Sequence, residues 1–174
     1  MTKEKILKSY ILLIERDVME RNIKSLGTAE NLLILCSRFW LKAHVFKCST
    51  PLILIDHTFK AVKLGNSVRY FHTLMMGLSH LNKTNLRSDF MTSPLTSKNE
   101  DLLIEIISFA QKDLKEDIYN IFGPYFPGAD AEHFVNAGFN LGKKFMGSDL
   151  IIHEKFKDNI YSFYGSREQL NIIN

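Results

Sequence analysis

Apolar residues recur at spacings of three and four along most of the chain, and no stretch sustains the alternation typical of a half-buried strand. This pattern predicts an all-α fold, with about six or seven helices packed into one globular bundle. A first helix begins after Thr2 and carries its apolar residues as far as Val18. The helices expected after it cover about 29–47, 52–64, 67–81, 97–121, 130–146 and 148–165.

Local start and stop signals support these boundaries. Thr50 followed by Pro51 is a good helix start, because proline at the first helical position loses no hydrogen bond. Ser97 and Glu100 have the spacing of a capping box, and Gly123 next to Pro124 is expected to end the helix that they open. The polar stretch 82–96 is the one clear break, and we interpret it as a long loop within one domain that covers residues 1–174.

Composition places the chain among folded proteins, since 45% of its 174 residues are hydrophobic and 24% are charged. The apolar runs are interrupted by charge well before the roughly 20 residues that a transmembrane helix needs, so no membrane span is expected. Charged residues follow the first apolar stretch, which argues against a secretory signal. Cys36 and Cys48 form no metal or disulfide motif, and we expect both to be reduced thiols in a cytoplasmic or otherwise intracellular protein.

The charged residues are unevenly distributed along the chain. Residues 38–88 contain eight Lys and Arg against a single acidic residue, whereas acidic residues predominate over 89–174. One interpretation is self-complementarity, in which the two halves face each other within the fold. The other is a basic face that binds anions.

The predicted helix 67–81 shows this basic character most clearly. At about 100° per residue, its basic side chains and Met76 form one stripe, while Phe71, Leu74, Met75 and Leu78 lie on the opposite face. Cations on the neighbouring helices could extend that stripe into a surface for nucleic acid, acidic proteins or lipid head groups. The candidate anion-binding residues are Arg38, Lys42, Lys60, Lys63, Arg69, His72, His80 and Lys83.

Thirteen phenylalanines and six methionines form a large supply of adaptable apolar side chains. They fill irregular core space, which is the plainer interpretation, or they line a groove for a partner helix. The candidate groove residues are Trp40, Met75, Met76, Phe145 and Met146. Gly138 and Gly142 have a spacing that lets two helices approach closely, and we expect an internal contact there, with self-association as the alternative.

Catalytic and metal-binding motifs are not recognisable in the sequence. His72 and His80 lie more than two helical turns apart, so they cannot both bind one ion, and no metal or cofactor is expected. Asp56 and His57 are adjacent and therefore do not face each other on a helix. A core histidine in an enzyme or a cofactor carrier remains an alternative, with His57 or His133 as candidates.

These observations rank three hypotheses for the function. The first is a non-enzymatic regulator, adaptor or effector that engages a protein partner through an apolar groove flanked by charge. The second is binding of nucleic acid or another polyanion through residues 38–88, and the third is the histidine-based enzyme or carrier. No family resemblance favours any one of them.

Overall fold

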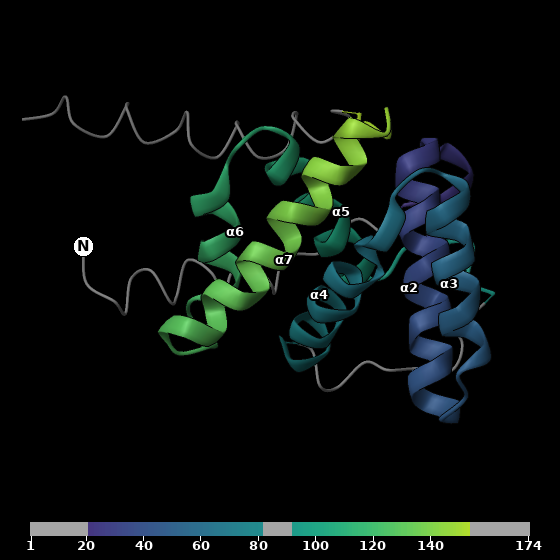
Figure 1. Cartoon of the computed structure of the whole chain (residues 1–174), viewed down its shortest axis with the longest axis horizontal. Coiled ribbons are helices and arrows are strands. Elements are labelled where there is room, and N and C mark those ends of the chain that lie inside the picture. Colours follow the sequence, from purple (N-terminus) through teal and green to yellow (C-terminus); the bar gives the residue numbers. More distant parts are fainter. Residues whose placement is uncertain (1–20, 82–91, 154–174) are drawn as a thin grey trace, which may run out of the picture.

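The computed structural model describes residues 21–81 and 92–153, and these residues fold into an all-α bundle (Figure 1). The elements are η1 (Ile23–Ser25), α2 (Thr28–Phe46), α3 (Thr50–Ala61), η2 (Gly65–Ser67), α4 (Val68–Leu81), α5 (Lys98–Gln111), α6 (Lys115–Phe122) and α7 (Gly128–Gly147). Within this part of the chain the only extended pairing is an isolated bridge between Asn22 and Leu95. The predicted fold class is therefore confirmed. The expected helix after Thr2 lies outside the described residues.

The helices form two groups (Figure 1). Helix α7 crosses the molecule with α4, α5 and α6 packed around it, whereas α2 and α3 lie side by side as a helical hairpin at one end. A single apolar core runs through both groups, and its fully buried members include Leu33 of α2, Phe59 of α3, Phe71 of α4 and Phe145 of α7. We refer to α4–α7 as the packed body and to α2 and α3 as the hairpin.

The packed body depends on two glycines where α7 meets α5. A Cβ atom added at Gly138 would lie 2.7 Å from the Ile106 side chain, and one added at Gly142 would overlap the Cβ of Ala110. Only hydrogen atoms fit at these two positions, so the helices approach more closely than ordinary side chains allow. The internal helix contact predicted from the glycine spacing is confirmed.

Four of the described helices end in the same way. In three of them, the backbone N–H groups of Leu64, Leu114 and Leu150 each donate to the carbonyl five residues earlier, which belongs in every case to a phenylalanine. In α2 the acceptor is Ala43, with Lys47 left-handed at φ of 49°. The residue before each leucine has a left-handed backbone: Lys63, Asp113 and Asp149 have φ values of 63°, 62° and 57°. This is the Schellman motif, which satisfies the free carbonyls at a helix end and usually employs glycine at the left-handed position.

One of these motifs corrects the expected helix over 97–121. The capping box at its start is confirmed, because Ser97 accepts from the Glu100 backbone and the Glu100 carboxylate accepts from the Ser97 backbone. The helix nevertheless ends at Gln111, and α6 begins at Lys115. The left-handed backbone at Asp113 turns the chain, so one expected helix becomes two.

The last expected helix also requires correction at its start. Residues 148–153 contain no helical turn, and the rest of the expected span lies outside the described residues. The Gln111 side chain binds this segment from both sides, donating to the Leu150 carbonyl at 2.7 Å and accepting from the Ile152 backbone at 3.0 Å. These bonds hold the segment extended against α5.

Candidate functional site

Arg38, the first of the candidate anion-binding residues, is buried between the hairpin and the packed body. Its Nε donates to Glu100 at 2.7 Å, and its terminal nitrogens donate to the carbonyl oxygens of Ser93 and Leu95 at 2.9 and 3.1 Å. The structure therefore corrects its assignment to an exposed basic surface. A guanidinium satisfied on several sides pins the segment before α5 onto α2 and offers little to an external ligand.

A second buried network lies beside the first. Arg21 forms an ion pair with Asp101, and the Thr96 hydroxyl donates to the other oxygen of the same carboxylate at 3.1 Å. Burial raises the pKa of Asp101, and the hydrogen bond and charge of Arg21 oppose that shift. One turn further along α5, burial and the charge of Asp101 raise the pKa of Glu105 to about 7.

Arg69, His72 and His80 of the predicted basic stripe are exposed on α4, but the histidines have neighbours within the molecule. The indole N–H of Trp40 donates to Nδ1 of His72 at 2.9 Å, and His44 stacks on the same indole ring at 5.0 Å. His80 contacts the Met76 carbonyl and the Phe126 ring. Lys83 lies outside the described residues. His72 therefore links α4 to α2, and His80 contacts its own helix and the connection between α6 and α7.

The five candidate groove residues do not form a groove. Trp40, Met75 and Phe145 belong to the buried core, with exposed fractions of 2%, 7% and 0%. Met76 is half-buried against that core, and only Met146 is exposed. Here the plainer interpretation holds, since soft apolar side chains fill space between packed helices. An apolar surface for a partner has to lie elsewhere.

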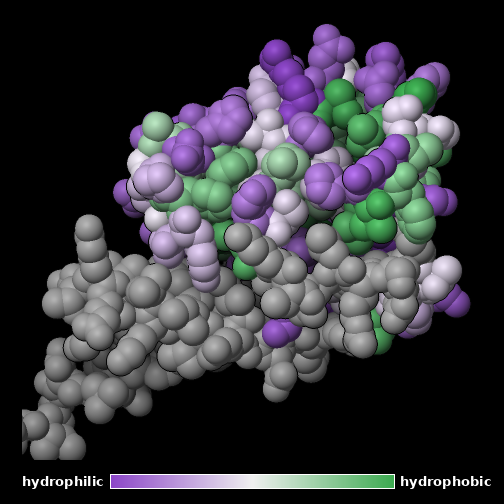
Figure 2. All heavy atoms as spheres, turned by 90° about the horizontal axis from the view of Figure 1, so that it is seen from below, coloured by the Kyte–Doolittle hydropathy of each residue, from purple (hydrophilic) through white to green (hydrophobic). Residues whose placement is uncertain are grey.

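The hairpin carries such a surface. Eleven large hydrophobic side chains are exposed among the described residues, and six of them belong to α2 and α3, with Phe46 65% and Ile53 54% exposed. Figure 2 shows hydrophobic atoms gathered at the end of the molecule that these two helices form. We call this set the hairpin face: Leu35, Val45, Phe46, Leu52, Ile53 and Leu54.

Helix α3 has apolar side chains around more of its circumference than the part that is buried. Its buried residues are Pro51, Ile55 and Phe59, a narrow stripe at spacings of four that packs toward α2 and the core. Leu52, Ile53 and Leu54 lie around the rest of its first turns and remain exposed. A helix that is hydrophobic around most of its circumference is normally buried on most of its circumference.

Cations surround the hairpin face. Lys42, Lys47 and Lys60 are exposed on α2, on the connecting loop and on α3. The one acidic side chain of α3, Asp56, accepts from Lys60 at 2.6 Å. The hairpin therefore presents an apolar centre with a net positive rim.

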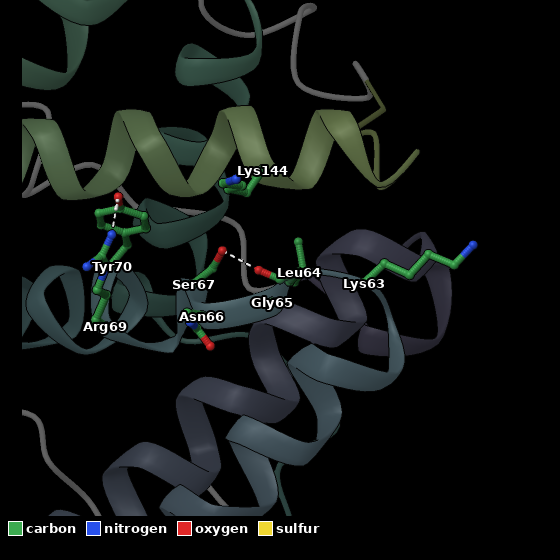
Figure 3. A pocket seen from close by; sticks show the side chains of 8 residues that line it. All are labelled: Lys63, Leu64, Gly65, Asn66, Ser67, Arg69, Tyr70 and Lys144. Carbon is green, nitrogen blue, oxygen red and sulfur yellow. Dashed lines mark hydrogen bonds between the residues drawn. The ribbon is translucent and has the colours of Figure 1, made fainter.

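Two further candidates, Lys63 and Arg69, line a pocket near the other end of α3 (Figure 3). Lys144 of α7 lines it as well, although the sequence analysis did not select this residue. Helix periodicity could not place Lys144 beside Lys63 and Arg69, because α7 begins more than sixty residues after the end of α3. We call this set the cationic pocket: Lys63, Leu64, Gly65, Asn66, Ser67, Arg69, Tyr70 and Lys144.

The remaining chemical candidates are separated from one another. His57 and His133, the two candidates for a core histidine, are both exposed, which corrects that assignment. Residues 21–81 and 92–153 contain no cluster of three or more His, Cys, Asp or Glu side chains that could hold a metal ion. No helix in those two ranges combines the length and the hydrophobicity required to span a membrane.

The two cysteines differ in their surroundings. Burial raises the pKa of the Cys36 thiol to about 12, whereas hydrogen bonds to Thr50 lower the pKa of the exposed Cys48 thiol. Cys48 lies in the loop that connects the two helices of the hairpin. A thiol-directed probe attached there would report on the hairpin face.

Comparison with known proteins adds no constraint. No protein-family model, curated protein or solved structure matches this chain. The geometry of the hairpin face and of the cationic pocket is therefore the basis for assigning a function.

Proposed function

We propose that this chain is a helical protein-binding module, and that its hairpin face receives an amphipathic partner segment with acidic flanks. The observation that carries the proposal is the exposed apolar surface of α3, where Leu52, Ile53 and Leu54 remain outside the core. Contiguous apolar surface rimmed by polar groups is typical of protein interaction sites.

The two helices supply complementary parts of this surface. Leu35 and Phe46 are about three full turns apart on α2, so they lie on the same side of that helix. Only a short loop separates Phe46, the last residue of α2, from Leu52 and Ile53 in the first turn of α3. A partner helix with apolar residues at spacings of three and four is the natural complement of such a surface.

Charge restricts the partner further. Within the part of the chain that the structure describes, Lys42 and Lys47 have no acidic neighbour at ion-pair distance, while Lys60 is already paired with Asp56. Carboxylates flanking the apolar residues of the partner would therefore meet unpaired lysines on α2 and in the loop. Rim charges of this kind mainly raise the association rate and select among partners.

The expected affinity is modest. Full burial of a Leu, Ile, Val or Phe side chain contributes about 1.5 to 3 kcal/mol, and roughly half of that remains to be gained at each position of the face. Six positions would then supply about 5 to 9 kcal/mol, before the loss of translational and rotational freedom on association. Association itself costs at least about 4 kcal/mol, so we expect dissociation constants of about 0.1 mM or weaker for an isolated partner helix.

Selection from a library of amphipathic helical peptides tests this proposal. Peptides enriched on the full chain should carry apolar residues with acidic flanks, and the double substitution Phe46→Gln and Ile53→Gln should weaken their binding at least about tenfold. Met146→Gln is the matched control, because Met146 is an exposed apolar residue of the packed body. Circular dichroism should show that all three proteins keep the same helix content.

Two results would contradict the proposal. The first is a selection that yields no enriched peptides, or peptides that bind the double variant as tightly as the wild type. The second is a wild-type protein that is a dimer in sedimentation while the double variant is a monomer. The hairpin face would then be an interface between two copies of the chain.

A further inference from the structure

The structure brings three cations from separate elements to one hollow. Lys63 lies in the turn after α3, Arg69 in the first turn of α4, and Lys144 near the end of α7 (Figure 3). The hollow has a volume of about 330 Å³, and none of the eight residues that line it is acidic. From this arrangement we infer a binding site for a phosphate group carried by a small ligand. This inference does not depend on the hairpin face.

Among residues 21–81 and 92–153, no carboxylate lies within ion-pair distance of the three cations of the pocket. The neighbouring Lys143, by contrast, pairs with Asp113 at 2.6 Å. The Arg69 guanidinium donates to the Tyr70 hydroxyl at 3.0 Å and lies 4.8 Å from the centre of that ring. This contact positions the guanidinium, and its phenol partner is neutral and does not compensate the charge.

Hydrogen bonds beside the pocket tie together the elements that line it. The Ser148 hydroxyl donates to the Lys63 carbonyl at 3.2 Å, which fixes the end of α7 to the turn after α3. Inside the turn, the Ser67 hydroxyl donates to the Leu64 carbonyl, as Figure 3 shows. Arg69 and Lys144 therefore project from elements whose separation is set by the fold.

The backbone of the turn also suits an anion. Leu64 has a right-handed conformation and Gly65 a left-handed one, with φ of 56°. Residues that alternate in this way direct successive N–H groups toward one side, as in sites that bind anions. The Leu64 N–H already donates to the Phe59 carbonyl, so the groups that would meet a phosphate are those of Gly65 and Asn66. Gly65 also leaves open space, because no atom lies within 4 Å of the position that a Cβ would occupy.

Lys63 is the cation of the pocket whose side chain can change its position. Figure 3 shows the Lys63 side chain extending away from Arg69 and Lys144. A lysine side chain has a flexible stem with four carbons, so it can swing toward a bound phosphate, which a dianion would favour. We therefore expect Arg69 and Lys144 to contribute most of the affinity and Lys63 a smaller part.

Titration of the full chain with inorganic phosphate at constant ionic strength, followed by amide chemical shifts, tests the inference. Saturating shifts should centre on Gly65, Asn66 and Ser67. The substitutions Arg69→Gln and Lys144→Gln should each weaken binding at least about fivefold, as expected for loss of a charge-assisted hydrogen bond. Lys98→Gln, which removes an exposed lysine outside the pocket, is the control and should leave the affinity unchanged.

Three outcomes would overturn the inference. Phosphate shifts that do not saturate, or that persist unchanged in Lys144→Gln, would show that no specific site exists. A single-stranded oligonucleotide that binds far more tightly than phosphate, and that is weakened equally by Lys42→Gln and Lys144→Gln, would show an extended polyanion surface. Because Lys42 does not line the pocket, this comparison separates the two cases.

Vesicles distinguish the two sources of the phosphate. Phosphatidylcholine vesicles with and without an anionic phospholipid should be compared for the wild type and Lys144→Gln. Binding that requires both the anionic lipid and Lys144 would assign the pocket to a lipid head group. Saturable phosphate binding without vesicle binding would assign it to a soluble phosphorylated compound. Both results support a phosphate site, and they are independent of the peptide selection.

Discussion

The packed body and the hairpin differ in how completely they bury their apolar side chains. Where α7 meets α5, Gly138 and Gly142 leave no room for even a methyl group. On the hairpin, by contrast, Phe46 and Ile53 are more than half exposed. Both regions are rich in apolar residues, so the difference lies in what covers them. Four helices surround one another in the packed body, whereas α3 packs mainly on α2.

This difference indicates where stability and function reside. In the packed body, side chains are in close contact, so a substitution should disrupt their packing. On the hairpin, apolar side chains remain exposed and take little part in packing. We therefore expect substitutions in the body to change the free energy of unfolding. Substitutions on the hairpin face should change binding and leave stability nearly unaltered.

Gly142→Ala should have the largest effect among the substitutions in the packed body. The new Cβ would overlap Ala110 and lie 3.1 Å from the Ile107 carbonyl, so α7 and α5 must move apart. Overpacking of this kind costs about 1 to 3 kcal/mol or more, and the better helix propensity of alanine offsets about 1 kcal/mol. We expect a net loss near 2 kcal/mol in urea denaturation.

Gly147→Ala is the control for that prediction. Gly147 is the last residue of the same helix, and nothing lies within 4 Å of its Cβ position. The substitution should be neutral or stabilise the protein by a few tenths of a kcal/mol. Equal losses of stability for Gly142→Ala and Gly147→Ala would show that the close helix contact at Gly142 does not stabilise the packed body.

Glu105→Gln should have the next largest effect, and one that depends on pH. Because the pKa of Glu105 is raised to about 7, its ionised form destabilises the folded chain above that pH. The penalty declines as the pH falls from about 7 toward the ordinary value of 4.5, and it vanishes only below that value, where the carboxyl is protonated in both states. The variant should therefore be more stable by about 1 to 2 kcal/mol at pH 8, a range that allows for partial solvent screening.

In urea titrations, the difference between the Glu105→Gln variant and the wild type should become small near pH 4.5 and disappear below it. Glu132→Gln provides the comparison, since Glu132 is exposed on α7. That substitution should leave stability unchanged at both pH values. A pH-independent gain for Glu105→Gln would mean that the buried charge is not its cause.

Much of the packed body could be predicted from the sequence because it depends on local signals. The two faces of α4 follow from helix periodicity, and the capping box at Ser97 follows from a spacing of three. The turn at Asp113 was missed because the apolar spacing continues through it. A repeated pattern could have revealed it, since Phe109 and Phe145 are each followed by Asp-Leu at the fourth and fifth positions.

The candidate sites were harder to predict because they depend on which elements meet. Arg38 and Lys42 are both cations on α2, yet Arg38 reaches Glu100, which lies 62 residues away in sequence, and Lys42 faces solvent. One signal was present, because Arg38 follows the buried Ile34 by four residues and so shares its face. Lys144 had no such signal, since only the crossing of α7 and α4 brings it near Arg69.

Lys63→Gly changes the turn that joins the hairpin to the packed body, and we expect a smaller effect on the free energy of unfolding. Lys63 has a left-handed backbone with φ of 63°, a conformation that costs a side chain about 1 kcal/mol relative to glycine. The greater freedom of glycine in the unfolded chain removes part of that gain. The variant should be more stable by about 0.5 kcal/mol in urea denaturation, while its affinity for phosphate falls.

Lys63→Gln separates the two effects at this position. It removes the same charge but keeps a side chain, so it should weaken phosphate binding without any gain in stability. If both variants bind phosphate as the wild type does, Lys63 contributes nothing to the pocket. Its left-handed backbone would then serve only to end α3.

Ile53→Gln should have the smallest effect on stability, and it tests the hairpin directly. The side chain is more than half exposed and lies opposite the buried stripe of Ile55 and Phe59, so little apolar contact is lost. Surface substitutions of this kind usually change stability by less than about 0.5 kcal/mol. Ile55→Gln, two residues along the same helix, should instead cost several kcal/mol because it places an amide in the core. Similar losses for both variants would mean that the outer side of α3 is covered in the folded chain, and the hairpin face would no longer be available to a partner.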